Sequence, residues 1–422
     1  MVRPTVAVIG AGISGLTAAH VLSRTHTVTV LEADDRLGGH AHTHDVPSSD
    51  GRCLAVDSGF IVHNERTYPH LLRLFSEIGV QTRPTEMSMS ITCSSCGLSY
   101  AGGRGARGIF AQPARLADPR FLRLLTEVPR FHRAARAMLA DDGAETTWGD
   151  FLAAGSYSDH FVEHFAIPLV SCVWSAGDSD ALAYPARHLF RFLDHHGMLS
   201  VTGSPTWRTV VGGSRTYVEA LAARLTDVRR AVPVAAVTRH SDGVDVSTAT
   251  GSVQSFDRVV VATHADQALD LLADASPEEK QDLAAITYSV NRTWLHTDSS
   301  VLPSRPGARA SWNYRMSCGD HRTRSGTGVV VSYWMNRLQG LEDTRDHVVT
   351  LNAAGHVNPS TVVAEMTYAH PVFTPDAVTA AARLRTAGGD RLAFAGAHLG
   401  WGFHEDGCRS GVEAAARFGA SW

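Results

Sequence analysis

The apolar positions of the first forty residues predict a strand, a helix and a second strand. Residues 6–9 (VAVI) form a short apolar, β-branched run, and residues 16–22 (LTAAHVL) have the composition of a helix. A second β-branched run covers residues 27–31 and is followed by Glu32. Short apolar strands alternating with helices are typical of parallel sheets. We therefore expect an α/β domain that starts near the beginning of the chain.

The turn between the first strand and the helix carries a dinucleotide motif. Residues 10–15 are GAGISG, which matches G-x-G-x-x-G in the required strand–turn–helix context. Gly10 allows the tight turn, Gly12 lets the backbone approach a pyrophosphate, and Gly15 lets the helix pack on the strand. The helix N-terminus attracts the phosphates. Glu32 stands where an acid accepts hydrogen bonds from a ribose hydroxyl, so the sequence predicts a bound dinucleotide.

The residues after Glu32 resemble a flavin signature. Residues 33–40 are ADDRLGGH, and an acid followed by R-x-G-G resembles the two-part FAD signature of the amine oxidase and phytoene desaturase superfamily. Residues 57–61 (DSGFI) are similar to the segment that passes the flavin ring in those proteins. This chain departs from the pattern at His40, where many relatives carry arginine. The resemblance implies FAD as the cofactor.

Two later segments extend this resemblance. Residues 232–263 form a strand cluster that resembles the superfamily's return into the FAD domain, with Val234 near the adenine. Residues 392–397 predict a last strand, and a helix that opens at Gly407 would point its positive end at the flavin. The resemblance implies FAD contacts from Gly10, Gly12, Ile13, Ser14, Gly15, Glu32, Ala33, Gly38, Gly39, His40, Gly59, Phe60, Ile61, Val234, Ala262, Gly396, Gly407 and Cys408.

The expected fold is α/β, with a Rossmann-type FAD-binding domain and an inserted α+β substrate domain, as in two-domain flavoproteins of the amine oxidase type. The chain has 422 residues, of which 44% are hydrophobic, enough for lobes with cores of their own. We expect a discontinuous FAD-binding domain made of residues 1–85, 206–275 and 390–422. Residues 86–205 and 276–389 would form the substrate domain.

A more specific resemblance concerns the C-terminal run. Residues 394–411 (FAGAHLGWGFHEDGCRSG) are similar to a bacterial subgroup of the superfamily, the predicted NAD/FAD-binding oxidoreductases. Members are often encoded beside cyclopropane-fatty-acid synthases, which implies a hydrophobic, fatty-acyl or lipid-like substrate. The resemblance implies a dehydrogenase or desaturase, with a redox-neutral double-bond isomerase and an amine oxidase as alternatives. A protein that only holds FAD is a further alternative.

Charge and composition narrow these alternatives. The net charge is −4, and no basic footprint for nucleic acid is present. Lys280 is the single lysine, and residues 276–281 (SPEEKQ) predict the exposed start of a helix. Many amine oxidases of the superfamily keep a lysine near the flavin N5 atom. The position of Lys280 therefore favours the desaturase-like branch.

The sequence also bears on location and surface. No run approaches the ~18 apolar residues of a membrane span, and no signal peptide is visible, so we expect a cytoplasmic protein with reduced cysteines. Residues 114–139 predict an arginine-rich helix that Pro129 should kink or split. Its arginines could contact a membrane surface, although an ordinary solvated face is the favoured interpretation. The oligomeric state stays open.

His404 and Glu405 are the candidate catalytic residues, because they directly precede the predicted flavin-facing helix. An imidazole titrates near neutral pH and could take the proton released when a C–H bond gives up hydride. The alternative is that these residues only cap and order the loop.

No metal site is predicted. His40, His42 and His44 alternate, but no matching carboxylate or thiolate pair accompanies them. Cys93 and Cys96 form a C-x-x-C pair without a second such pair, so the sequence favours an incidental loop pair over a zinc site.

Overall fold

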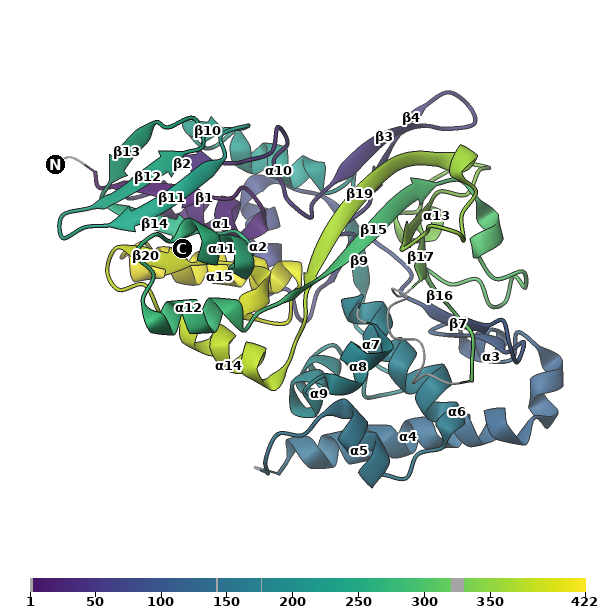
Figure 1. The fold of residues 1–422 in the computed structure, drawn as a ribbon. Helices are drawn as coiled ribbons and strands as arrows, with labels where there is room; N and C mark the ends of the chain where they lie inside the picture. Colours follow the sequence, from purple (N-terminus) through teal and green to yellow (C-terminus); the bar gives the residue numbers. More distant parts are fainter. Residues whose placement is uncertain (1–2, 142, 176, 320–329) are drawn as a thin grey trace.

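The computed structural model describes residues 3–141, 143–175, 177–319 and 330–422. Figure 1 shows two lobes, with the long strands β15 (Tyr288–His296) and β19 (Val362–Pro371) running from one to the other. Both chain ends lie in the lobe that contains β1 (Thr5–Ile9) (Figure 1).

A parallel sheet of five strands forms the centre of this lobe. Its order is β10-β2-β1-β14-β20, and every neighbouring pair is parallel. Besides β1, its strands are β2 (Thr27–Leu31), β10 (Asp227–Arg229), β14 (Arg258–Val261) and β20 (Leu392–Phe394). Residues Val6, Ala7 and Val8 of β1 are fully buried, since a parallel strand is covered on both faces and is apolar throughout. The sheet confirms the predicted α/β, Rossmann-type fold.

Alternate residues of β1 enter two separate cores. Val6 and Val8 face the core that includes α1 (Ile13–Leu22) and α15 (His404–Arg417), which pack on each other. Ala7 and Ile9 face the core that includes the antiparallel sheet of β11 (Val234–Arg239), β12 (Val244–Thr248) and β13 (Val253–Phe256). The remaining helices of this lobe are α2 (Pro69–Ile78), α10 (Arg215–Ala222), α11 (Ala265–Leu271), α12 (Pro277–Ala284) and α14 (Pro375–Leu384). The central strands come from all three predicted pieces of the FAD-binding domain, whose boundaries stay a prediction.

A mixed sheet of seven strands forms the frame of the second lobe. Its order is β19-β15-β18-β17-β16-β7-β8, with β18 (Val348–Leu351), β17 (Val331–Trp334), β16 (Trp312–Met316), β7 (Met89–Cys93) and β8 (Ser99–Gly102). The described helices of this lobe are α3 (Gly105–Ile109), α4 (Pro119–Leu139), α5 (Trp148–Ala154), α6 (Asp159–Phe161), α7 (Ile167–Trp174), α8 (Asp178–Ala183), α9 (Ala186–His195) and α13 (Met335–Leu338).

Short strands and single turns complete the chain. Two small antiparallel sheets pair β3 (Thr43–Pro47) with β4 (Cys53–Asp57), and β9 (Trp207–Val210) with β5 (Val62–Asn64) and β6 (Thr82–Pro84). The π-helical turn η2 (Val162–Ala166) lies between α6 and α7. The 3-10 turns are η1 (Pro113–Ala117), η3 (Ser299–Val301), η4 (Pro359–Thr361) and η5 (Ala397–Leu399).

The arginine-rich helix α4 continues through Pro129, so the predicted split does not occur. Pro129 removes one backbone hydrogen bond, but the buried residues Leu124, Phe131 and Ala135 anchor the helix on both sides of it. This buried stripe fits the interpretation of an ordinary amphipathic helix. The membrane contact stays a prediction. Across the described residues, every helix is too short or too polar to cross a membrane.

Candidate flavin site

The glycine turn after β1 requires the residues found there. Gly10 has φ +98°, and a Cβ on it would lie 2.7 Å from the carbonyl oxygen of Ala262. A Cβ on Gly15 would lie 1.9 Å from the carbonyl oxygen of Gly10. The backbone of Ala262 thus closes the turn from β14, and both glycines are needed for close packing.

Gly12 differs from these two glycines because space lies beside it. Apart from Gly12 and its chain neighbours Ala11 and Ile13, none of the described residues has an atom within 4 Å of the position that a Gly12 Cβ would take. Gly12 is the N-cap of α1, so the backbone N–H groups of Ile13 and Ser14 begin the helix beside this space. The amide of Gly38 donates to the carbonyl of Ala11 (2.9 Å), which places the Gly38–Gly39 turn against the same loop. The N-terminus of α1, the Gly38–Gly39 turn and the open space beside Gly12 therefore fit the pyrophosphate of a dinucleotide.

Glu32 holds this loop from the end of β2. Its Oε2 accepts a hydrogen bond from the amide of Ala11 (2.7 Å), and its Oε1 accepts one from the amide of Asp34 (3.0 Å). The amide of Val232 donates to the Glu32 carbonyl (2.9 Å), which brings Val234 close to this edge of the site. Ala33, next to Glu32, is exposed. A ribose contact of Glu32 and an adenine contact of Val234 stay predictions.

The segment 57–61 passes directly beside His40. The amide of Phe60 donates to the His40 carbonyl (2.8 Å), and a Cβ on Gly59 would lie 2.0 Å from that oxygen. Ile61, next in the segment, is buried. The two segments in which the sequence predicted flavin contacts therefore lie together.

Four rings form a group around His40 that we call the histidine cluster: His40, His264, Tyr368 and His370. The His40 ring centroid lies 5.1 Å from that of Tyr368, 5.6 Å from that of His370 and 5.9 Å from that of His264. Burial lowers the pKa of all three histidines, and that of His370 falls to about 4. Within the described structure, the buried Nε2 of His40 has no hydrogen-bond partner. The cluster is uncharged at neutral pH and has a polar atom free for a ligand.

Sequence reasoning missed His264 and His370. A signal existed for His264, because it follows β14, and ligands of open α/β sheets bind at the carboxyl ends of the strands. His370 lies near the end of β19, more than a hundred residues later, and only the tertiary fold brings it here. The ring of His42 contacts the hydroxyl group of Tyr368 (3.1 Å), and the ring of His44 contacts that of Ser58 (2.8 Å).

The N-terminus of α15 packs on the N-terminus of α1. A Cβ on Gly407 would lie 2.7 Å from Cγ2 of Ile13 and 3.0 Å from Oγ of Ser14. The Gly396 amide donates to Oγ of Ser410 (2.9 Å), which ties the end of β20 to the same helix. Cys408 turns its thiol toward α1, where it accepts a hydrogen bond from Thr17 (3.7 Å). Any flavin contact of Cys408 would therefore come from its backbone.

His404 is buried at the start of α15. Its ring stacks on Phe60 with centroids 3.6 Å apart, and its Nε2 lies 2.7 Å from the hydroxyl of Tyr217. Burial, with a smaller contribution from His63, lowers the pKa of His404 to about 3. A base of this strength is poorly matched to neutral pH. The catalytic role of His404 stays a prediction, and these contacts favour a role in holding the loop.

Glu405 contacts the N-terminus of α2. Its Oε1 accepts hydrogen bonds from the backbone amide (3.1 Å) and Nδ1 (2.7 Å) of His70, and its Oε2 accepts one from the amide of Leu71 (3.0 Å). A carboxylate at this position satisfies helix N–H groups and complements the helix dipole. Both oxygens are thus engaged, which favours a structural role, while the predicted catalytic role is untested.

Lys280 lies on the exposed surface of α12, close to its N-cap residue Ser276. This confirms the predicted exposed helix start. The flavin cradle around Gly12 is formed by α1, the Gly38–Gly39 turn and the start of α15, and Lys280 belongs to none of them.

Comparisons with known proteins agree with this architecture. A family model for flavin-containing amine oxidoreductases matches residues 13–418. A Mycobacterium tuberculosis protein named as a flavin-containing monoamine oxidase, AofH, is 27% identical over 291 residues, which cover 66% of this chain and 61% of AofH. The chain thus spans about three fifths of the length of this curated relative.

Solved structures share the fold. Cyclohexylamine oxidase from Brevibacterium oxydans has a TM-score of 0.71 at 17% identity and covers 99% of this chain and 98% of its own. A fatty acid isomerase from P. acnes that produces CLA also has a TM-score of 0.71, at 16% identity, with 98% of both chains covered. Together, the match over residues 13–418 and the Gly10–Glu32 geometry confirm the predicted superfamily and its flavin cofactor. The chain belongs to the flavin-containing amine oxidoreductase family.

Proposed function

We propose that the protein is an FAD-dependent oxidoreductase that takes hydride from a C–H bond of a hydrophobic, uncharged substrate of fatty-acyl or lipid-like character. The histidine cluster carries this proposal, since it places uncharged rings beside the Gly38–Gly39 turn. Bound FAD would supply a hydride acceptor at N5.

The residues of the chain would bind the cofactor and exclude water. The α1 N-terminus and the Gly38–Gly39 turn would hold the pyrophosphate. Next to the histidine cluster, Nδ2 of Asn291 lies 3.2 Å from Nδ1 of His370 and can donate to it, which leaves the proton of His370 on Nε2. A buried, neutral donor can orient a polar group of the substrate without attracting a counter-charge.

Two other activities, amine oxidation and double-bond isomerisation, have support of their own. Amine oxidation is supported by the family's description and by the fold shared with cyclohexylamine oxidase. A redox-neutral double-bond isomerisation is supported by the fold shared with the fatty acid isomerase. The exposed position of Lys280, away from the cradle, is the reason to place amine oxidation second.

Anaerobic bleaching of the flavin separates the three activities. The purified protein is mixed with unsaturated fatty acids, their esters, or primary amines, and the oxidised flavin absorbance is followed. We expect bleaching by an acyl substrate, with a product that carries one more double bond and needs an electron acceptor for turnover. Bleaching by amines alone would overturn the proposal. Conversion of an acyl substrate at constant redox state, without any acceptor, would establish the isomerase.

A matched pair of variants tests the histidine cluster itself. His370→Phe keeps a ring in the cluster but removes its hydrogen bonds, whereas His356→Phe changes an exposed histidine elsewhere. We expect His370→Phe to retain FAD and to slow flavin reduction, and His356→Phe to behave as the unchanged protein. Equal reduction rates in both variants would remove the cluster from the substrate site.

A further inference from the structure

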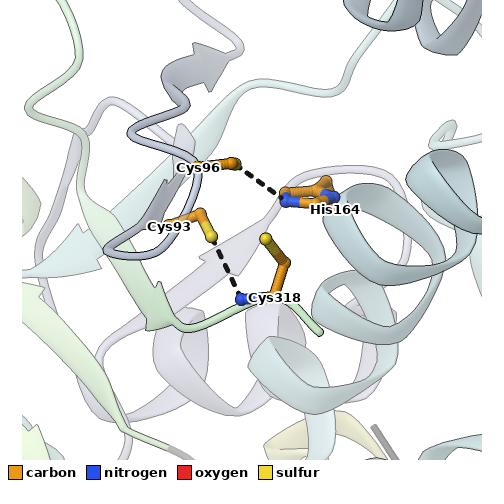
Figure 2. A group of neighbouring side chains, drawn as sticks. All are labelled: Cys93, Cys96, His164 and Cys318. Carbon is orange, nitrogen blue, oxygen red and sulfur yellow. Dashed lines mark hydrogen bonds between the residues drawn. The ribbon is translucent and has the colours of Figure 1, made fainter. Parts of the chain in front are cut away.

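Three cysteine thiols and one imidazole meet in the second lobe. Figure 2 shows Cys93, Cys96, His164 and Cys318, and their four potential ligand atoms all lie within 4.8 Å of one another. These residues come from the β7–β8 hairpin, from the segment after β16 and from the π-helical turn η2. We call them the cysteine–histidine cluster. It is separate from the flavin cradle, which is built on the parallel sheet.

We propose that the cysteine–histidine cluster is a structural zinc site. Three thiolates and one imidazole form a Cys₃His set, which binds Zn²⁺ tetrahedrally with Zn–S of about 2.3 Å and Zn–N of about 2.0–2.1 Å. Ligand atoms around such an ion are about 3.5–3.8 Å apart. The four ligand atoms lie within 4.8 Å of one another, so binding an ion requires them to approach by about 1 Å at most.

The hairpin gives Cys93 and Cys96 the backbone of a metal-binding turn. The amide of Gly97 donates to the Cys93 carbonyl (3.0 Å), and the amide of Cys93 donates to the carbonyl of Leu98 (2.8 Å). Gly97 has φ +68°, which lets the chain reverse after Cys96. The backbone amide of Cys318 donates to the Cys93 thiol (3.2 Å). Amides that point at sulfur stabilise the thiolate, which is the form that binds metal.

His164 is oriented as a ligand through its other nitrogen. Nδ1 lies 3.1 Å from the carbonyl oxygen of His160, and Nε2 lies 3.4 Å from the thiol of Cys96 (Figure 2). A proton on Nδ1 that bonds to a carbonyl leaves a lone pair on Nε2, directed at the cysteines, as in many histidine–zinc sites. His164 also lies in the π-helical turn Val162–Ala166, and such turns are frequent at functional sites.

The donor set favours zinc and a structural role. Thiolates are soft ligands, and a tetrahedral arrangement of three sulfurs and one nitrogen suits zinc better than the harder, oxygen-seeking cations. Four protein ligands leave no open position for a substrate or an activated water. The ion would join Cys318 to a hairpin more than two hundred residues earlier in the chain and to the helical part of the lobe. It would therefore stabilise the contact between the seven-stranded sheet and those helices.

Metal content measured on matched variants tests the proposal. The flavin-loaded protein, purified without a metal-affinity step, is analysed by inductively coupled plasma mass spectrometry. We expect about one zinc ion per chain, and less than a tenth of that in Cys93→Ser and Cys318→Ser. Cys53→Ser changes an exposed thiol on β4 and should keep its zinc. Zinc retained in both Cys93→Ser and Cys318→Ser would overturn the proposal.

Two measurements on the unchanged chain decide the matter if those variants do not fold. Replacement of the metal by Co²⁺ should produce the strong visible d–d bands of tetrahedral thiolate coordination. Zinc should also protect Cys96 and Cys318 from iodoacetamide, with Cys53 reacting equally in its presence and absence. An unchanged cobalt spectrum, equal alkylation with and without zinc, or a Cys93–Cys96 disulfide in the purified protein would refute the site. FAD content, measured on the same sample, keeps this result independent of the proposed oxidoreductase activity.

Discussion

The contact between His404 and Tyr217 separates a structural role of His404 from a catalytic one. Tyr217 is fully buried, and its hydroxyl lies 2.7 Å from Nε2 of His404. His404→Phe keeps a ring against Phe60 but leaves that hydroxyl unpaired, which should cost about 1–3 kcal/mol of unfolding free energy. His404→Ala also removes the ring stacked 3.6 Å from Phe60, and loss of a buried ring typically costs about 3–5 kcal/mol.

Three measurements on one preparation provide the assay: urea unfolding, flavin content and the anaerobic rate of flavin reduction. Because burial lowers the pKa of His404 to about 3, we expect the structural role. His404→Phe should then be more stable than His404→Ala, and each variant's reduction rate should follow its flavin content. Loss of a general base would instead slow reduction by a factor of about 10² to 10⁴. A stable, fully flavinated His404→Phe protein with such a loss would refute our reasoning.

Three further predictions concern the cradle and the buried histidines. Gly12→Val should fold but release FAD, because its side chain would fill the space beside α1; a flavin-loaded variant would contradict this. Glu32→Ala should weaken FAD binding by about 1.5–3 kcal/mol in apo-protein titrations, with Glu32→Gln less affected, and an unchanged dissociation constant would exclude the role of Glu32. Burial lowers the pKa of His296 from 6.5 to about 4, so its stabilising contribution is complete above pH 6.5 and is lost as the pH falls toward 4. The free energy of unfolding is measured with urea at pH 7.5 and at pH 5.5. Its decrease between the two pH values should be about 1.4 kcal/mol smaller in His296→Gln than in the unchanged protein. In His356→Gln, which changes an exposed histidine, the decrease should equal that of the unchanged protein.

The sequence predicted those parts of the site that are encoded locally. Gly10, Gly15 and Glu32 lie in one strand–helix–strand unit, where each residue type is required by a turn, a close packing or a hydrogen bond. The histidine cluster is different, because His264 and His370 reach His40 only when separate sheets are assembled. The hydrophobic periodicity of the sequence does not indicate that these three histidines lie close together in the fold.

The cysteine–histidine cluster escaped prediction for the same reason. Cys93 and Cys96 are visible as a pair, but Cys318 stands alone in its segment, and His164 lies nearly seventy residues after the pair, next to His160 at an i, i+4 spacing that is also ordinary on a helix face. Pattern searches depend on ligands that come in local pairs. The alternating His40, His42 and His44 are the more visible histidine pattern, but the rings of the last two pack on each other and contact hydroxyl groups of Tyr368 and Ser58.

The construction of the parallel sheet has a consequence for how the protein is made. β20 and α15 are among the last elements of the chain, yet they flank β14 and α1 in the finished lobe. Contacts between residues so far apart in the sequence form slowly, because closing the long loop between them costs conformational entropy. On the ribosome, β1 and α1 must wait without their final partners while more than 350 further residues are synthesised. The lobe should therefore complete its fold only after β20 and α15 have been synthesised. Until then its apolar strands are exposed, and binding of chaperones or FAD reduces aggregation.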